Sequence, residues 1–489
     1  MLAKVTALLD TLADFLFQPV SATRRRWLAW AWIAGLYLVG VFLIGQLLNW
    51  GRGPYDFHDW AEVNAARIAF VQDAVETGQL PLHMPDASAL RGVTDRYLAL
   101  PDVILSPQML LLPFFSVTGW VLFNTLLLYT LGALALLWFL RRFDLSPLVF
   151  ALLFLIYAAN GHVQAHLSVG HVNFAATYLM PWLIVLLVQA VDGGQAGKLP
   201  GWRWVAATSF LLFFILLNGA FHQFVWCLFF LGFFGLFAWK YFGLALKTLV
   251  ASCLLAIFRL LPPALELGKF DNEYLGGYPT FAAVLDGLVR FTDPYQSFGT
   301  RGFLTPLGAW EFDLFVGLAG TLFLLGFGLW RWLRKLDAPD GFPQFLLPAL
   351  AMTALAVGRV YRPFMLLPIP LINGERVSSR LIILPFLVLA VMAAVQMQRW
   401  LDSRNLRAEL RWGMAGLAVL LLHDLWQHTR AWRVNVAADA YGRMDVNLAI
   451  KVVSNHPDPA YTNLLLAGAV VTLVTAVALL ALAWRERKG

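Results

Sequence analysis

Long apolar stretches separated by short polar segments dominate the pattern along this chain. An α-helix needs roughly 17 to 25 predominantly apolar residues to cross a bilayer. Runs of about that length lie at 27–48, 120–140, 174–191, 221–240, 246–262, 311–331, 380–397 and 462–484. Shorter or interrupted runs lie at 146–159, 204–218, 344–358 and 412–425. The pattern therefore predicts an all-α polytopic membrane protein with about twelve transmembrane helices.

Composition supports this class and excludes several others. Of the 489 residues, 60% are hydrophobic and 13% are charged, whereas a soluble domain is about a quarter charged. A soluble fold could not bury so much apolar surface, because even about 300 residues hide only about three quarters of their chain's surface. The composition excludes a soluble enzyme, a disordered protein and a fibrous protein. Cys227 and Cys253 lie within apolar runs, so we expect neither a disulfide framework nor a metal site there.

Basic residues indicate the orientation, because cytoplasmic loops carry an excess of Lys and Arg. With the N-terminus inside, the inner segments hold 20 of the 36 basic residues but only 9 of the 29 acidic ones, a net charge of +11. The outer segments have a net charge of −4. We therefore expect a multi-pass protein of the inner or plasma membrane with both termini in the cytoplasm.

The predicted domain organisation follows from these spans. Residues 1–26 form a cytoplasmic, amphipathic helix at the membrane surface, 27–484 form a single transmembrane domain, and 485–489 form a cytoplasmic tail. The apolar piece 103–117 contains Pro107 and Pro113 and is expected to be re-entrant or interfacial. The outer loops are long and should carry the function, together with short interfacial helices; they span about 49–118, 160–173, 263–310, 359–379 and 426–461.

The first outer loop opens with acidic residues directly after the first span. Asp56, His58 and Asp59 are followed by a helix over 59–77 with an apolar face, which ends at Gly78. Ionisable groups at the mouth of a membrane helix are costly and are usually functional. An equally good interpretation from spacing is a capping box, in which Asp59 and Glu62 stabilise the start of the helix.

This arrangement resembles the GT-C superfamily of integral-membrane glycosyltransferases. The resemblance is an acid after the first span, here Asp56 or Asp59, then a helix along the outer surface, then the stop Gly78-Gln79-Leu80-Pro81. The long loop 263–310 also matches the module. Gly308-Ala-Trp-Glu-Phe-Asp and Asn373-Gly-Glu-Arg-Val-Ser-Ser-Arg380 look like segments of bacterial members, and a large C-terminal soluble domain is not expected.

The resemblance implies a hexosyl- or pentosyltransferase of the cell envelope. In such enzymes a first-loop carboxylate acts as general base on the acceptor, and the donor sugar is carried on polyprenyl phosphate. We expect Asp59 as the first choice for this base and Asp56 as the second. The implied partners are the lipid-linked donor, a glycan or lipid acceptor and membrane lipids, with no nucleic acid. A divalent ion bound by Asp56 or Asp59 would be Mg²⁺ or Mn²⁺.

Histidines form a second group. His162, His166 and His171 lie in the loop predicted after the third span, and His162 and His166 would share one helix face. Structural roles, donor-phosphate or acceptor contact and metal binding all remain open for them. We expect His162 and His171 near the donor phosphate and His166 near the acceptor. His222 should face the same side.

A third group is basic. Arg376 and Arg380 are four residues apart and would project from one face of a helix, with Glu375 holding one of them. They could clamp a lipid phosphate or only reach lipid headgroups. Glu311 lies at the start of the predicted eighth span, where helix capping or acceptor contact would explain it.

Two other classes of function are consistent with an outward-facing membrane protein. A lipid or sugar transporter or flippase would place ionisable residues at mid-membrane depth, whereas the charges here gather at span boundaries. A lipid-linked polysaccharide polymerase or ligase would show an arginine-rich pair of outer loops instead of a first-loop acid.

Overall fold

The computed structural model describes residues 11–22, 26–266, 269, 273–298, 307–338, 340–366, 375–404, 406–445 and 452–488. Helices make up almost all of the regular structure in this part of the chain. The strands found there are the antiparallel pair β1 (Ser297–Phe298) and β2 (Leu307–Gly308). The α-helices are α2 (Arg26–Leu47), α3 (Ala65–Glu76), α4 (Val117–Arg142), α5 (Pro147–Ala159), α6 (Gly161–Ser168), α7 (Met180–Gln195), α8 (Trp202–Leu217), α9 (Phe221–Phe237), α10 (Phe242–Leu260), α11 (Phe281–Val289), α12 (Gly317–Phe323), α13 (Leu346–Leu355), α14 (Gly358–Tyr361), α16 (Ile383–Asp402), α17 (Ala408–Ala431), α18 (Val434–Tyr441) and α19 (Pro459–Lys488).

The structure also contains π-helical and 3₁₀ segments, several of which continue these α-helices. The π-helical segments are η3 (Trp60–Asn64) and η11 (Leu324–Arg331). The 3₁₀ segments are η1 (Val20–Ala22), η2 (Asn49–Gly51), η4 (Ala87–Leu90), η5 (Tyr97–Ala99), η6 (Pro107–Phe114), η7 (Val172–Leu179), η8 (Trp239–Tyr241), η9 (Pro262–Glu266), η10 (Ala309–Glu311), η12 (Pro343–Phe345), η13 (Arg362–Leu366) and η14 (Ser378–Ile382).

The protein is an all-α membrane protein. Each of the twelve predicted apolar runs contains a helix. Within the described residues, 7 helices are long and apolar enough to cross a membrane, and they span Trp27–Leu47, Val117–Arg142, Pro147–Ser168, Val172–Gln195, Trp239–Leu260, Ser378–Asp402 and Pro459–Arg487. Four shorter apolar helices cover Trp202–Leu217, Phe221–Phe237, Gly317–Arg331 and Pro343–Leu355.

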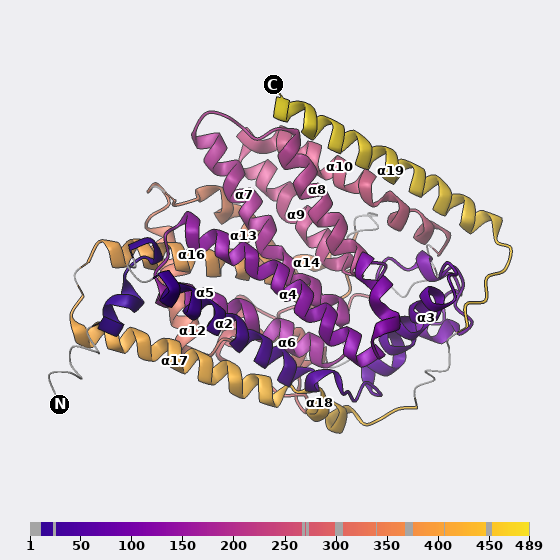
Figure 1. Cartoon of the computed structure of the whole chain (residues 1–489), viewed down its shortest axis with the longest axis horizontal. Helices are drawn as coiled ribbons and strands as arrows, with labels where there is room; N and C mark the ends of the chain where they lie inside the picture. Colours follow the sequence, from indigo (N-terminus) through magenta and orange to yellow (C-terminus); the bar gives the residue numbers. More distant parts are fainter. Residues whose placement is uncertain are drawn as a thin grey trace.

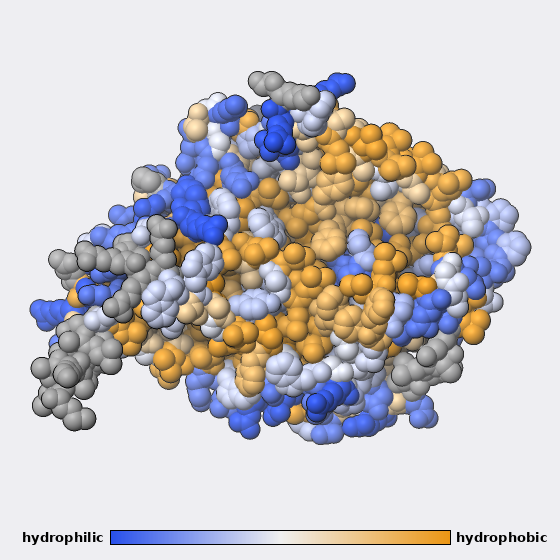
Figure 2. All heavy atoms as spheres, viewed as in Figure 1, coloured by the Kyte–Doolittle hydropathy of each residue, from blue (hydrophilic) through white to orange (hydrophobic). Residues whose placement is uncertain are grey.

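The outside of this helical bundle is apolar over a broad area. Figure 2 shows hydrophobic residues across the middle of the molecule, with hydrophilic residues along opposite margins. Helix α19 is the clearest case, because only 11% of its most apolar window is buried. Side chains such as Leu466, Leu473 and Leu480 are more than half exposed. Exposed apolar surface of this extent marks contact with lipid rather than with water.

The interior is built around α5, which other helices surround (Figure 1). The span Pro147–Ser168 is buried throughout its most apolar window, and it contacts α2, α16 and α17. Helix α4 lies against η7 and α7, while α19 packs on α10 and α8 at the other side of the bundle. Helix α3 lies at one end, next to η6.

Two predicted boundaries are wrong. The segment 160–168, predicted to begin an outer loop, forms the buried helix α6 within the span Pro147–Ser168. Asn160 ends α5, and its Oδ1 accepts a hydrogen bond from Val163 N at 3.1 Å. The eighth apolar helix begins at Gly317, not at residue 311. Residues Asp313 and Phe315 instead pack onto the start of α6, where Phe315 O accepts from Gly161 N at 2.9 Å. A Cβ atom at Gly161 would lie 1.8 Å from Asp313 Oδ1, so this approach requires glycine.

The other predicted short elements fall near their expected places. The first-loop helix forms as η3 followed by α3, and Gly78 has a φ of +66° just beyond its end. The piece 103–117 contains the short helix η6 rather than a span. Residues 11–17 of the predicted N-terminal helix are helical, and Phe15 packs against Trp32 of α2 with ring centroids 6.1 Å apart. The predicted helix over 1–26 does not continue through residues 18–22, which contain the 3₁₀ turn η1. Residues 1–10 and 23–25 lie outside the described residues.

Candidate functional site

A cavity of about 650 Å³ lies at the end of the bundle where α3 is found. The first loop (residues 48–116), the turn after α6, and the segments around residues 308–311 and 376–380 form its walls. Its ionisable lining consists of the acids Asp59, Glu62, Asp102 and Glu311, the cations Arg67, Arg91, Lys269, Arg376 and Arg380, and the histidines His58, His171 and His222. Seven of the predicted site residues line it, namely His58, Asp59, Glu62, His171, Glu311, Arg376 and Arg380.

Asp59 is positioned by contacts between the first loop and the turn after α6. Trp60 Nε1 donates to Ser168 O at 3.0 Å, and Asn64 Nδ2 donates to Gly170 O at 2.7 Å. Gly170 has a φ of +107°, and a Cβ atom there would lie 2.4 Å from Trp60 N. Only glycine permits this approach. The turn thereby brings His171 Nε2 to 2.9 Å from Asp59 Oδ2.

The pair formed by Asp59 and His171 keeps the carboxylate ionised. Burial would raise the pKa of Asp59, but the hydrogen bond and charge of His171 hold it well below its ordinary value. Burial lowers the pKa of His171, although Asp59 opposes this shift. His171 Nδ1 in turn lies 2.6 Å from His166 Nδ1. When His171 is neutral and its Nε2–H donates to Asp59, its Nδ1 accepts from His166. When His171 is protonated, its Nδ1 donates to His166 instead.

The capping interpretations are wrong for this region. Asp59 is the residue before η3, but its side chain makes no capping hydrogen bond. Glu311 and Asp313 do not cap α12, which follows Val316 without a side-chain cap. Asp313 accepts hydrogen bonds from Phe315 N at 2.9 Å and from His428 Nε2 at 2.9 Å. Asp313 therefore fastens the segment between η10 and α12 to its neighbours instead of starting a helix.

The basic pair is arranged differently from the prediction. Arg376 precedes the helical turn η14 and belongs to an extended segment, because Val377 forms a parallel bridge with Gly276. Arg380 Nε donates to Glu311 Oε2 at 2.7 Å, with a second contact between Arg380 Nη2 and Glu311 Oε1. Burial would raise the pKa of Glu311, but the charge and hydrogen bonds of Arg380 lower it. Both arginines line the cavity. They do not project from one helix face as predicted, because Arg376 precedes the helical turn η14.

Glu375 does not hydrogen-bond either arginine, contrary to the prediction. Its Oε2 lies 3.2 Å from His222 Nδ1 and accepts from Trp226 Nε1 at 2.7 Å. Burial would raise the pKa of Glu375, but the charge and hydrogen bond of His222 lower it. Glu375 lies behind the cavity wall and positions His222, which lines the cavity as expected.

Four further charged residues of the lining were missed by the sequence analysis, namely Arg67, Arg91, Asp102 and Lys269. Asp102 Oδ2 lies 2.6 Å from Arg91 Nη2 and 3.4 Å from Arg67 Nη1. Burial would raise the pKa of Asp102, but Arg91 and Arg67 hold it below its ordinary value. Arg67 is 4% exposed and sits one helical turn from both Val63 and Val71, on the predicted apolar face. The charge of Arg67 on an otherwise apolar helix face was the feature that could have identified it as a site residue.

Besides Glu375, three predicted site residues lie outside the cavity lining. Asp56 lines a separate hollow, where its Oδ2 is 3.4 Å from Arg443 Nη1. His162 and His166 are fully buried in α6 behind the cavity. Among the described residues, the group of His, Cys, Asp and Glu side chains close enough to share an ion contains neither Asp56 nor Asp59.

The Arg380–Glu311 pair should be essential for the stability of this site. Glu311 is 4% exposed and Arg380 17% exposed as side chains, so Glu311→Gln leaves a largely buried cation unpaired. Losing one partner of such a pair costs about 3 to 5 kcal/mol. We expect a clearly lower melting temperature for the purified variant.

The matched control is Asp286→Asn. The Arg290–Asp286 pair is exposed and should contribute less than about 1 kcal/mol to the free energy of unfolding. Equal melting temperatures for Glu311→Gln and Asp286→Asn would contradict a stabilising role for the buried pair.

No protein-family model, curated protein or solved structure matches this chain. Its function therefore has to be inferred from the side chains that line the cavity.

Proposed function

We propose that this protein is a membrane glycosyltransferase of the GT-C type, which transfers a sugar from a polyprenyl-phosphate donor to a glycan or lipid acceptor. The observation that carries the proposal is a single cavity that holds an ionised carboxylate, Asp59, together with the guanidinium groups of Arg376 and Arg380. Transfer between these substrates needs a proton acceptor and an anion-binding group in one place.

Asp59 is the proposed general base. As the acceptor hydroxyl oxygen attacks the anomeric carbon, the bond from that carbon to the lipid phosphate breaks and the configuration inverts. The acceptor proton passes to Asp59. The electrons of the broken bond stay on the lipid phosphate, whose charge changes from −1 in the diester to −2 in the released monoester. His171 holds the carboxylate at 2.9 Å and so orients it for this step.

Cationic side chains are the proposed site for the lipid phosphate. Arg376 and Arg380 are joined in the lining by Arg67, Arg91 and Lys269. A guanidinium group offers a planar fork of donors that matches phosphate oxygens. Arg380 lies in the first turn of the span Ser378–Asp402, so a phosphate near it would lie close to the membrane boundary, with the polyprenyl chain along apolar helices. A Mg²⁺ or Mn²⁺ ion, if the reaction uses one, would be held by Asp59 without Asp56.

The proposed topology is twelve crossings, both termini in the cytoplasm and the cavity on the outer face of the plasma or inner membrane. The charge difference between the two sets of segments, +11 against −4, supports it. Nucleotide sugars are not found outside the cell, so an outward cavity suits a membrane-held donor.

Labelling of single cysteines tests this topology. Glu76 and Arg404 are both exposed and lie in segments proposed to face opposite sides. In intact cells, a membrane-impermeant thiol reagent should label Glu76→Cys but not Arg404→Cys, in a background that lacks Cys227 and Cys253. Labelling of Arg404→Cys alone would reverse the orientation and exclude the proposed reaction site.

The proposed base is tested by Asp59→Asn. The substitution removes the carboxylate but keeps its shape, so we expect transfer to be lost while the melting temperature changes little. The measurement is mass spectrometry of envelope glycans and lipid-linked sugars in cells that lack the protein, and in the same cells complemented with each variant.

Asp56→Asn is the matched control, because Asp56 lies in a different hollow and its variant should restore the wild-type profile. Full restoration by Asp59→Asn would remove Asp59 from the mechanism. An unchanged profile in cells that lack the protein would contradict a transferase.

The proposed phosphate site is tested with Arg376→Lys. Lysine keeps the charge but loses the guanidinium fork, so binding of undecaprenyl phosphate should weaken by about 1 to 3 kcal/mol, roughly 5- to 150-fold. Arg290→Lys is the control and should bind normally, because the Arg290 side chain is exposed just beyond the end of α11. Equal affinity of both variants, measured by ligand-dependent thermal stability in detergent, would indicate that Arg376 only meets lipid headgroups.

A further inference from the structure

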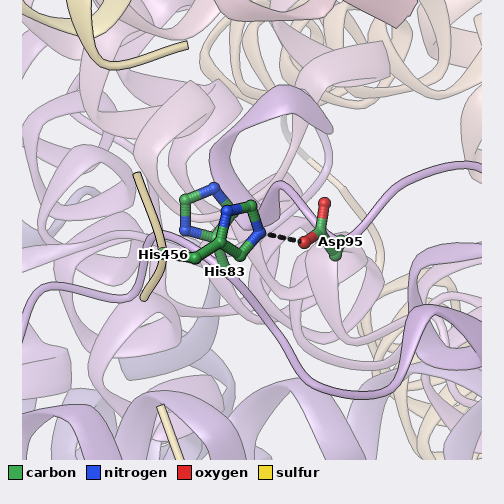
Figure 3. Close-up of side chains that lie close together, drawn as sticks. All are labelled: His83, Asp95 and His456. Atoms are coloured by element: carbon green, nitrogen blue, oxygen red, sulfur yellow. Dashed lines mark hydrogen bonds and ion pairs between the residues drawn. The ribbon is translucent and has the colours of Figure 1, made fainter. Parts of the chain in front are cut away.

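Three ionisable side chains gather away from the cavity, where the first loop meets the chain segment that leads into α19. Figure 3 shows His83, Asp95 and His456 side by side, with the two imidazole rings stacked. The ring centroids are 3.9 Å apart, and His456 Nε2 lies 2.8 Å from Asp95 Oδ2. One ligand atom from each of the three residues lies within 4.8 Å of the other two.

His83 supplies an independent indication that a ligand is bound here. It is 1% exposed, yet neither of its ring nitrogens has a hydrogen-bond partner. Its contact with Asp458 Oδ2 is 3.6 Å, which is longer than a hydrogen bond. A neutral imidazole carries one N–H and one lone pair, and leaving such groups buried without partners costs about 1 to 3 kcal/mol. Coordination of a cation by the lone pair would offset part of that cost.

The backbone around the cluster is held in place without any ion. His83 and Arg96 form an antiparallel bridge, and Met84 N donates to Asp95 O at 2.8 Å. On the other segment, Asn455 Oδ1 accepts from His83 N at 3.1 Å. Arg96 Nε also donates to Asp458 Oδ2 at 2.6 Å. The two segments are thus positioned by their own hydrogen bonds, which keeps the three side chains near one another.

We propose that His83, Asp95 and His456 bind a divalent transition-metal ion of the Zn²⁺ class. Two imidazoles and one carboxylate are a ligand set that suits Zn²⁺, with a fourth position for water or for Asp458. Zinc ligands lie about 2.0 to 2.2 Å from the metal, so the three groups must draw together by roughly 1 Å. His456 and Asp95 have room to turn, because their side chains are 53% and 44% exposed.

The ion would fasten the segment before α19 to the first loop. More than 350 residues separate His456 from His83 in the sequence, and α19 is attached mainly to α10 and α8. The first loop also supplies Arg91 and Asp102 to the cavity. The bound metal is therefore a structural clamp on one wall of the cavity, and it goes beyond the proposed transfer reaction.

Metal content of the purified protein tests this proposal without any enzyme assay. The full chain, freed of its affinity tag and treated with EDTA, is incubated with Zn²⁺ in detergent, desalted and analysed by mass spectrometry. We expect about one Zn²⁺ per chain. Co²⁺ in place of Zn²⁺ should give visible absorption from the nitrogen and oxygen ligands.

His456→Gln and Asp95→Asn should each weaken Zn²⁺ binding by at least about tenfold, and both positions are exposed enough for the fold to persist. His423→Gln is the matched control, because His423 is 60% exposed and lies 3.3 Å from Asp424 outside the cluster. Its binding should equal that of the wild type. Failure of the wild type to retain Zn²⁺, or unchanged binding in both cluster variants, would overturn the proposal.

Discussion

The candidate site depends on one close approach between two backbone segments. The start of the first-loop helix lies against the turn after α6, where Gly170 leaves room for Trp60 N. Two hydrogen bonds, from Trp60 Nε1 to Ser168 O and from Asn64 Nδ2 to Gly170 O, hold the segments together. Because of this approach, a carboxylate from residue 59 meets an imidazole from residue 171 at the wall of a cavity. A side chain at position 170 would separate them.

Ion pairs stabilise the charged side chains that line the cavity. Buried acids are stable here because each has a cationic or imidazole partner, as with Glu311 beside Arg380 and Asp102 beside Arg91 and Arg67. Such pairing keeps the carboxylates ionised in a place where burial alone would favour their neutral form. The result is a lining that carries opposite charges close together, which is the property that proton transfer and phosphate binding both require.

The sequence predicted the class of fold well, because the length and periodicity of apolar runs depend only on local composition. The first-loop helix and its end at Gly78 were also local features. The burial of residues 160–168 was not predicted, because Asn160 ends one helix and caps the next, so that α6 stays buried. The interpretations of Asp59 and Glu311 as caps failed because their partners, His171 and Arg380, lie far away in the sequence.

Some of the site could not have been found from spacing. Arg91 and Asp102 reach the cavity because of the path of an irregular loop, which no periodicity encodes. Arg67 could have been predicted from the sequence, because it interrupts the apolar face of a predicted helix. The sequence could not show that Asp56 and Asp59 line different hollows, because the two residues are only three positions apart in one segment.

The most direct test of the central claim is a cryo-electron microscopy structure of the protein in lipid nanodiscs with undecaprenyl phosphate. We expect the phosphate in the cavity that Asp59 lines, in contact with Arg376 or Arg380, and the prenyl chain against the apolar outer surface. A phosphate bound outside this cavity, or a lipid held within the helical bundle at mid-membrane depth, would contradict a glycosyl transfer site and favour a transporter.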